Sequence, residues 1–343
     1  MFRKPRIAWL TVNHLCNLKC KWCYQREVGK KKKMTKELAR KLVNLLTDLG
    51  VENTVLIGGE PTLYEYFFTI IKYIKEKGMR ATVVTNALRF SQHKFVEKTA
   101  RTGLDDVTTS IKGSSRVEYE QSTGYAGGYD LVRQAIKNLQ RTSIRQKVSI
   151  TVSRSIIENW DTMIRLIKDC EAILFSISFE KPCILPEKKV VFDDKMLSKE
   201  LASFIEEVMY PSLLETGKDF RLEFMCPQCY FSEDFINRVE KDKHAFGGCL
   251  LLRTKGLVFD PDGFVLPCNH FAGYPLGQYG KDFQTASEFI EWDQQDLIRS
   301  FYENIKLAPC KKCSQCDRWH KCGAGCRLFW FYRGPEQLPV NSR

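Results

Sequence analysis

The stretch RIAWLTVNHLCNLKCKWCYQ, residues 6–25, joins a strand-like run to three closely spaced cysteines. Residues 6–12 are mostly apolar and include β-branched side chains, which favours a β-strand. Cys16, Cys20 and Cys23 follow with the spacing C-x3-C-x2-C. Thiolates bind soft metals, and four are the usual complement for zinc or for an iron–sulfur cluster. Three thiolates on a four-iron cluster leave one iron open to a substrate or cofactor.

Strand and helix patterns alternate from this stretch to about residue 180. Further strands are predicted at 53–59, 80–87, 105–113, 146–153 and 172–180, and helices at 34–49, 64–78, 91–103, 128–142 and 157–169. Thr35 can cap the first helix and Gly50 can end it. The alternation predicts an α/β fold whose parallel sheet curls into a complete or partial (β/α)6 barrel. Sites in such folds lie at the carboxyl ends of the strands, where the cysteines stand.

Length and composition restrict the class of protein. The chain has 343 residues, of which 43% are hydrophobic and 27% charged, as in soluble globular proteins. It has no apolar run long enough to span a membrane and no signal peptide, so we expect a cytoplasmic protein. Fourteen cysteines in a reducing compartment favour metal or redox chemistry. The net charge of +12 suits anionic partners, but no nucleic-acid-binding signature is present, which makes nucleic acid a minor hypothesis.

The sequence changes in character towards its C-terminus. Residues 186–225 are expected to form a connector with one helix at 195–215. From 226 to 335 cysteines are frequent and helical patterns scarce, and residues 257–268 predict a β-hairpin that turns at Asp260–Gly263. Such a region needs something other than apolar burial to hold it together, and bound metal is the natural candidate. We therefore expect a barrel domain at 1–185, the connector, and a cysteine-rich domain at 226–335.

The cysteine stretch resembles the signature of the radical S-adenosylmethionine (SAM) superfamily, because an aromatic residue precedes the third cysteine. The segments GGEP (58–61), TNA (85–87) and SIKG (110–113) follow the second, third and fourth strands, where family members contact SAM. The resemblance implies a SAM site made of Trp22, Gly58, Gly59, Glu60, Pro61, Thr85, Asn86, Ser110 and Lys112. Lys112 departs from the family pattern, in which aspartate is common.

The resemblance also implies a mechanism. Cys16, Cys20 and Cys23 would hold a [4Fe–4S] cluster, and SAM would bind its open iron. An electron from the cluster would break a C–S bond of SAM, and the 5′-deoxyadenosyl radical would remove a hydrogen atom from the substrate. The cofactor carries this chemistry and the protein supplies orientation and a dry site. The rival interpretations are a structural zinc loop, which needs a fourth ligand from elsewhere, and a redox thiol set.

The C-terminal cysteines resemble the SPASM extension of radical SAM enzymes, which usually carries two auxiliary [4Fe–4S] clusters. By this resemblance Cys249, Cys268 and Cys326 would ligate the first cluster, and Cys313, Cys316 and Cys322 the second. Cys310 is expected to supply the fourth ligand of the second cluster. The first cluster lacks an obvious fourth thiolate, so it is either open to substrate or recruits Cys226 or Cys229. The alternative is a zinc knot.

Cys226 and Cys229 have three open interpretations. They are cluster ligands, catalytic donors of a hydrogen atom to a substrate radical, or buried structural residues. Donor cysteines occur in radical SAM epimerases, which puts both residues among the catalytic candidates.

Only the resemblance to SPASM proteins indicates a class of substrate. SPASM proteins modify peptides in most cases, so we expect a ribosomally made peptide to be crosslinked, epimerised or oxidised. Because the first strand begins near residue 7, we expect no fused leader-binding domain, which weakens the peptide hypothesis unless a separate protein recognises the leader. A flavodoxin- or ferredoxin-type protein would supply electrons. The alternatives are dehydrogenation, epimerisation or decarboxylation of a small molecule such as a sugar or nucleoside, and a non-catalytic electron-transfer protein.

Overall fold

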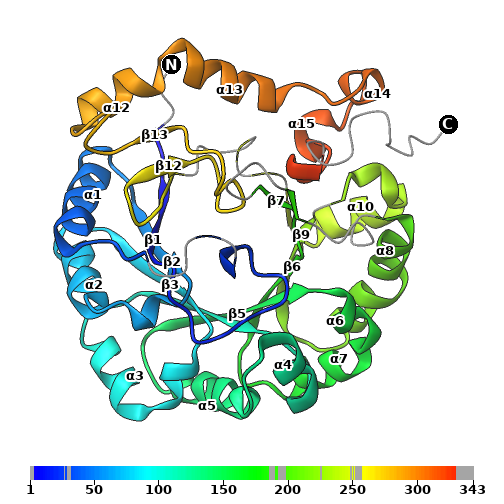
Figure 1. Ribbon diagram of the computed structural model, residues 1–343. Coiled ribbons are helices and arrows are strands. Elements are labelled where there is room, and N and C mark those ends of the chain that lie inside the picture. The colour runs from blue at the N-terminus through cyan, green and yellow to red at the C-terminus, as the bar shows by residue number, and fades with distance from the viewer. Residues whose placement is uncertain are drawn as a thin grey trace.

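A single curved sheet organises the molecule. The computed structural model describes residues 4–26, 28, 32–184, 190–191, 198–224, 226–247, 249, 251 and 257–329. Its main sheet has eleven strands in the order β10-β9-β6-β5-β4-β3-β2-β1-β11-β12-β13. Every pair from β10 to β11 is parallel, and the last two pairs are antiparallel. Figure 1 shows helices along the outer side of the sheet and the loop after β1 inside its curve.

The predicted alternation of strands and helices is confirmed. The strands are β1 (Ile7–Asn13), β2 (Asn53–Gly58), β3 (Arg80–Thr85), β4 (Asp106–Ile111), β5 (Arg145–Val152) and β6 (Leu174–Phe179). The helices are α1 (Lys36–Asp48), α2 (Phe67–Glu76), α3 (His93–Ala100), α4 (Arg116–Thr123), α5 (Gly128–Gln140), α6 (Arg154–Glu158) and α7 (Trp160–Asp169). Of these, α4 was not predicted. The strands face the helices with buried aliphatic side chains, so the fold is α/β with a partial barrel.

Local sequence explains why α1 forms where it does. The Thr35 hydroxyl accepts a hydrogen bond from the Leu38 backbone N–H at 3.1 Å, and Gly50 follows the helix with a left-handed φ of 70°. Leu42, Leu45 and Leu46 are buried on its inner side. Burying one leucine side chain stabilises a fold by about 1.5–3 kcal/mol, so this face fixes α1 on the sheet.

Later segments extend the same sheet at both edges. The strands β9 (Asp219–Phe224) and β10 (Ala245–Gly247) continue it beyond β6, and β11 (Leu257–Phe259) lies parallel to β1. The predicted hairpin is confirmed as β11 and β12 (Phe264–Leu266), and β13 (Gly277–Gln278) pairs with β12. The Asp260 carboxylate accepts hydrogen bonds from the backbone N–H groups of Asp262 and Phe264 at 2.9 and 2.8 Å, which closes the turn.

The expectation of few helices after residue 226 was wrong. The region contains α10 (Glu233–Lys241), α12 (Ala286–Asp293), α13 (Asp296–Lys306), α14 (Lys311–Ser314) and α15 (Trp319–Cys322). A capping box between Thr285 and Glu288 starts α12, a signal that the sequence did carry.

The predicted connector contains its one continuous helix, made of α8 (Lys199–Phe204), a π-helical segment (Ile205–Met209) and α9 (Tyr210–Leu214). Ahead of it, β7 (Cys183–Ile184) pairs with β8 (Val190–Val191) in a separate two-stranded sheet. None of the helices in the described ranges is long and apolar enough to cross a membrane.

Candidate functional site

The loop after β1 is bound tightly to the end of β2. The backbone N–H groups of Gly59 and Glu60 donate to the carbonyl oxygens of Asn13 and Leu15 at 2.8 and 2.7 Å. A Cβ atom on Gly58 would lie 2.4 Å from the Asn13 oxygen, and one on Gly59 would lie 2.4 Å from the Leu15 oxygen. Only glycine permits this approach, so the two glycines bring the loop onto the carboxyl end of the sheet.

The other side of the cysteine loop is attached to α4. The backbone N–H groups of Lys19 and Lys21 donate to the carbonyl oxygens of Thr123 and Ser122 at 2.8 and 3.1 Å. Cys16 and Cys20 lie within the attached stretch and Cys23 follows it; Cys20 is buried, while Cys16 and Cys23 are half-buried. The Cys23 backbone N–H donates to the Cys20 carbonyl oxygen at 3.2 Å, so the three thiols are held on one loop attached to β2 and α4.

Glu60 joins the ends of β2 and β3. Its side chain is 1% exposed. One carboxylate oxygen accepts from the backbone N–H and hydroxyl of Thr62 at 3.0 and 2.7 Å and from the Thr85 hydroxyl at 2.6 Å. The other accepts from the Asn86 backbone N–H at 2.8 Å. Burial raises the pKa of Glu60, and these hydrogen bonds oppose that shift. The residue thus fixes the two strand ends beside the cysteine loop.

Polar groups surround Cys16. The Asn86 amide donates to the Asn17 side-chain oxygen at 2.8 Å and lies 3.9 Å from the Cys16 sulfur, and the Leu18 backbone N–H donates to that sulfur at 3.4 Å. Burial raises the pKa of the Cys16 thiol to about 12. A thiol of this kind becomes a thiolate when a metal supplies positive charge. The pocket around Cys16 thus offers N–H donors to a sulfur atom.

The buried hydroxyl of Tyr119 indicates that a polar group could bind beside the thiols. Its side chain is 1% exposed, and its hydroxyl has no hydrogen-bond partner among the described residues. Cys20, Glu60 and Cys16 are its electrostatic neighbours. A buried hydroxyl without a partner costs stability, so its position fits a bound polar group next to the cysteines.

The other predicted SAM-site residues lie at the same end of the sheet. Pro61 begins the short helix η2 (Pro61–Leu63) directly after Glu60. Ser110 is buried on β4, and Lys112 follows that strand and is half-buried. Trp22 is half-buried and packs against one of the two large hydrophobic clusters. These residues thus lie near the carboxyl ends of the strands, and their roles in SAM binding remain a prediction.

Three C-terminal cysteines form what we call the inner set: Cys249, Cys268 and Cys326. All three contact one small apolar cluster that includes Leu251 and Phe271. Burial raises the pKa of the Cys268 thiol to about 12, and the Cys249 thiol nearby adds to the shift. The inner set is therefore a group of half-buried, neighbouring thiols.

A partly buried ion pair lies beside the inner set. Lys181 contacts Glu223 at 2.8 Å, and Cys326 and Cys268 are among its electrostatic neighbours. A cation at this position offsets the negative charge that thiolates would carry.

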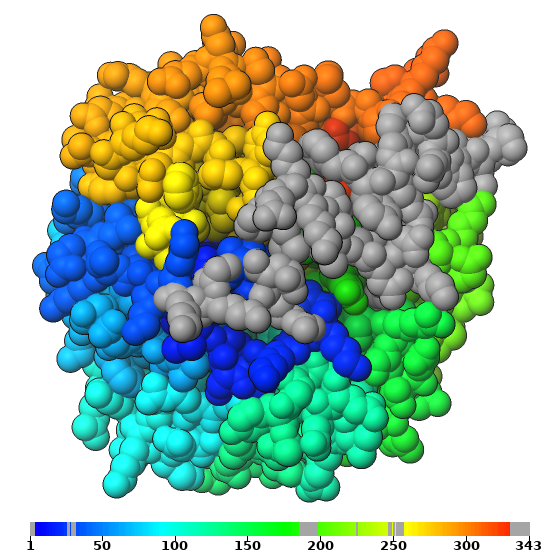
Figure 2. Space-filling model, viewed as in Figure 1, coloured from blue at the N-terminus to red at the C-terminus, as the bar shows by residue number. Residues whose placement is uncertain are grey.

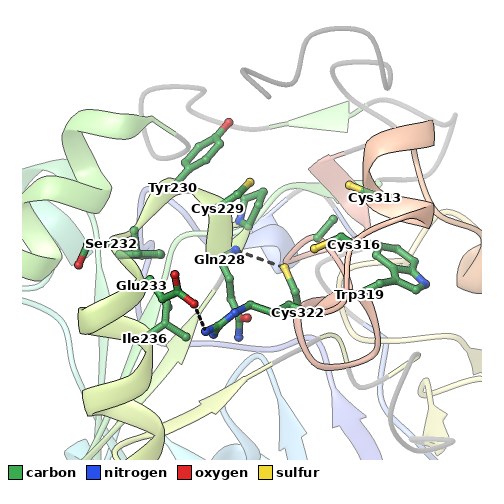
Figure 3. A pocket seen from close by; sticks show the side chains of 14 residues that line it. Gln228, Cys229, Tyr230, Ser232, Glu233, Ile236, Cys313, Cys316, Trp319 and Cys322 are labelled. Carbon is green, nitrogen blue, oxygen red and sulfur yellow. Dashed lines mark hydrogen bonds and ion pairs between the residues drawn. The ribbon is translucent and has the colours of Figure 1, made fainter. Parts of the chain in front are cut away.

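Five other cysteines form what we call the outer set: Cys229, Cys310, Cys313, Cys316 and Cys322. Four of them, all except Cys310, line one cavity of about 530 Å³ together with Trp319. Figure 3 shows the sulfur atoms of these four around a common space. Cys229 comes from the short helix η7 (Gln228–Tyr230), far from the others in sequence.

Cys226 belongs to neither set. Its side chain is 3% exposed within a large hydrophobic cluster, and burial raises the pKa of its thiol to about 12.

Arg327 lies between the two sets. Its side chain is 5% exposed and its guanidinium lies 5.4 Å from the centroid of the Trp319 ring. One Nη donates to the Leu307 carbonyl, and the other has no partner among the residues that the structure describes. Cys249, Cys313 and Cys326 are its electrostatic neighbours. A buried cation with a free N–H fits a cluster, whose sulfur atoms accept hydrogen bonds.

One aromatic contact joins the N-terminal cysteine loop to the inner set. The rings of Tyr24, next to Cys23, and His270, near Cys268, have centroids 5.0 Å apart. Burial lowers the pKa of His270 to about 3, and its Nδ1 has no partner in the described part of the chain. Figure 2 shows dark-blue N-terminal atoms next to the yellow atoms near residue 260 on one face.

Among the described side chains, no three His, Cys, Asp or Glu converge closely enough for a single metal ion.

One protein-family model matches part of this chain. The model of the radical SAM superfamily matches residues 10–170, which include the cysteine loop and the ends of β1 to β4. Residues 10–170 thus form a domain similar to the radical SAM superfamily.

Individual relatives in this superfamily differ in what they make. Over 345 residues the chain is 26% identical to the AdoMet-dependent heme synthase of Methanosarcina barkeri, with 95% of this chain and 92% of that protein covered. It is 25% identical over 169 residues to the Fe-coproporphyrin III synthase of the same organism and 29% over 170 residues to a probable GTP 3′,8-cyclase of Pyrococcus horikoshii. These two matches cover only 42% and 54% of those relatives, or about half.

Solved structures share the fold over nearly the whole chain. AdoMet-bound anSMEcpe superimposes with a TM-score of 0.72 at 16% identity, covering 94% of this chain and 89% of that one. Streptococcus suis SuiB bound to the precursor peptide SuiA gives 0.70 at 18% identity, covering 98% and 75%. These likenesses confirm, at the level of the fold, the expected radical SAM barrel with a SPASM-like cysteine-rich extension.

Sequence patterns missed two residues near the cysteines. Tyr119 and Arg327 stand out only because each has a buried polar atom without a partner among the described residues. The pattern did give a weak signal for Arg327, since a charged residue directly follows Cys326. Nothing in the spacing indicated that Cys229 would lie beside Cys322.

Proposed function

We propose that this chain cleaves SAM reductively and uses the resulting radical to remove a hydrogen atom from its substrate. The observation that carries the proposal is the loop of three thiols, attached to β2 and α4 beside Glu60, Asn86 and the Tyr119 hydroxyl, which has no partner among the described residues. A single soft metal cluster would use the thiols, and a polar cofactor would satisfy the hydroxyl.

The cysteines of the loop and the residues at the neighbouring strand ends have separate roles. Cys16, Cys20 and Cys23 would hold a [4Fe–4S] cluster which, with SAM bound, supplies the electron that breaks a C–S bond. Glu60 fixes the strand ends and Asn86 orients an amide towards the Cys16 sulfur. The loop lies inside the curve of the sheet (Figure 1), and a site that excludes water would protect a reactive radical.

The inner and outer sets would hold two auxiliary [4Fe–4S] clusters. Their thiols are gathered from distant segments, and Arg327 and His270 provide buried groups that still need partners. The contact between Tyr24 and His270 makes the inner set the nearer neighbour of the SAM site. Electrons would then enter or leave through these sets, from a flavodoxin- or ferredoxin-type protein attracted by the net charge of +12.

A ribosomally made peptide is the substrate class we propose, with crosslinking, oxidation or epimerisation as the outcome. Support comes from the shared fold with SuiB, whose structure holds a precursor peptide. An extended chain would bind in the mouth of the barrel between the cysteine loop and the inner set.

A small carboxylated molecule such as a tetrapyrrole is the second candidate. The observation in its favour is the alignment with a heme synthase over 95% of this chain. A partly buried lysine at the inner set, Lys181, is also compatible with a carboxylate ligand, although Glu223 contacts it here.

The experiment is anaerobic turnover with SAM, a reductant and each candidate substrate, read by mass spectrometry. A peptide that loses two hydrogens supports crosslinking or oxidation, and one that gains deuterium from heavy water without another mass change supports epimerisation. Turnover of Fe-coproporphyrin and of no peptide supports the second candidate. No 5′-deoxyadenosine with a fully loaded chain contradicts the whole proposal.

A further inference from the structure

We propose that Cys229 is the fourth cluster ligand of the outer set and that Cys310 is not a ligand. The inference rests on the proposed function, since it takes an auxiliary cluster to be bound there. A [4Fe–4S] cluster takes four thiolates, and the outer set offers five, so one cysteine is surplus.

The shape of the cavity distinguishes Cys229 from Cys310. Cys229 lines the cavity with Cys313, Cys316 and Cys322, whereas Cys310 does not. Figure 3 shows the Cys229 sulfur on the side of the space opposite to the C-terminal cysteines. A cluster at the centre would therefore have a thiol on each side only when Cys229 takes part.

The backbone beside Cys229 is already fixed to a cluster cysteine. The Gln228 N–H donates to the Cys322 sulfur at 3.2 Å. Backbone N–H groups that donate to a ligating sulfur stabilise the thiolate and tune the cluster. This contact holds the η7 turn against the C-terminal segment at the point where Cys229 projects.

Polar contacts between α10 and α15 keep the two segments together. Arg318 donates to Asn237 at 3.0 Å and lies 3.5 Å from Glu233, and Lys321 lies 3.1 Å from Glu240. Since Cys229 stands just before α10 and Cys322 ends α15, this docking sets the distance across the cavity.

Cys310 has a different position. It is the residue before α14 and a close neighbour of Cys313, three residues later on the same turn. It does not line the cavity that the other four thiols share, so we infer that it does not replace Cys229.

The test compares Cys229→Ser with the matched control Cys310→Ser in the full-length, anaerobically reconstituted chain. Three clusters correspond to about twelve irons per chain. We expect Cys229→Ser to lose about four irons, or to show an altered auxiliary-cluster signal by electron paramagnetic resonance, while Cys310→Ser keeps both the iron and the signal. The reverse pattern overturns the inference, as does an unchanged cluster in both variants.

A second measurement uses the unaltered protein, so it does not depend on how a variant folds. The loaded chain is treated with iodoacetamide and its labelled cysteines are identified by mass spectrometry. We expect Cys229 to be protected although its side chain is exposed in the protein structure, and Cys310 to be labelled. Labelling of Cys229 in the fully loaded chain contradicts the inference. Formation of 5′-deoxyadenosine in the same samples reports separately on the proposed function.

Discussion

The N-terminal cysteine loop and the outer set hold their thiols by different means. The loop is attached by backbone hydrogen bonds to β2 and α4, over a sheet with two large hydrophobic clusters. The outer set depends on a sulfur contact from Gln228 and on exposed or partly exposed ion pairs of α15. Exposed ion pairs contribute little, about 0–1 kcal/mol each. The fold therefore positions the first region, and on the proposed function a bound cluster would hold the second together.

Removal of all metal should separate the two regions most strongly. Structural metal sites contribute on the order of 10 kcal/mol to folding, so residues 310–326 should lose their protection against hydrogen exchange in the stripped chain. The amides of β2 to β5 should stay protected, because apolar burial holds them. Hydrogen exchange of loaded and stripped protein, read by mass spectrometry, measures both. Equal loss of protection in the two regions contradicts the comparison.

Gly59→Ala should damage the first region without removing a ligand. The new Cβ would lie 2.4 Å from the Leu15 oxygen and 2.6 Å from the His14 oxygen, so the loop must move. Displacements near 1 Å can cost about 100-fold in rate, and we expect a loss of that order in 5′-deoxyadenosine formation. Gly78→Ala is the control: nothing lies within 4 Å of its Cβ, and its φ of 77° predicts a stability cost alone. Normal SAM cleavage by Gly59→Ala would show that the close approach is not needed.

Glu60→Gln should destabilise the same region by a smaller amount. The amide cannot accept all the bonds that the carboxylate accepts from Thr62, Thr85 and Asn86. Leaving a buried polar group without a partner costs about 1–3 kcal/mol, which urea unfolding of the barrel should detect. Glu120→Gln, at an exposed position, provides the baseline. Equal unfolding curves for the two variants would exclude the role given to Glu60.

Arg318→Ala should have the smallest effect. The Arg318 side chain contacts Glu233 and Asn237 across the cavity, and loss of a surface ion pair costs about 0.2–1 kcal/mol. We expect faster exchange in α15 of the loaded chain and little change in its iron content. Arg101→Ala, which removes a surface pair with Glu97, should leave α15 unchanged. A loss of the outer cluster in Arg318→Ala would mean that the docking carries more of the stability than the metal does.

Local sequence patterns predicted the first region well, because residues close together in the sequence determine its strands, helices and cysteine loop. Periodicity located β1 to β6 and their helices, and the C-x3-C-x2-C spacing located the loop. The pairing of β11 with β1 and of β9 with β6 joins segments far apart in sequence, and no spacing encodes such contacts. The place of Cys229 depends on the docking of α10 against α15, so three interpretations stayed open until the structure brought it beside Cys322.

The most direct test of the account measures SAM cleavage in one variant of each region. Cys20→Ser removes a thiol of the N-terminal loop, and Cys268→Ser removes one of the inner set. Both chains are reconstituted, reduced and supplied with SAM, and 5′-deoxyadenosine is quantified. We predict that Cys20→Ser forms none, and that Cys268→Ser still forms it but makes no modified substrate. Cleavage of SAM by Cys20→Ser, or its absence in Cys268→Ser with the N-terminal cluster still loaded, would contradict the account.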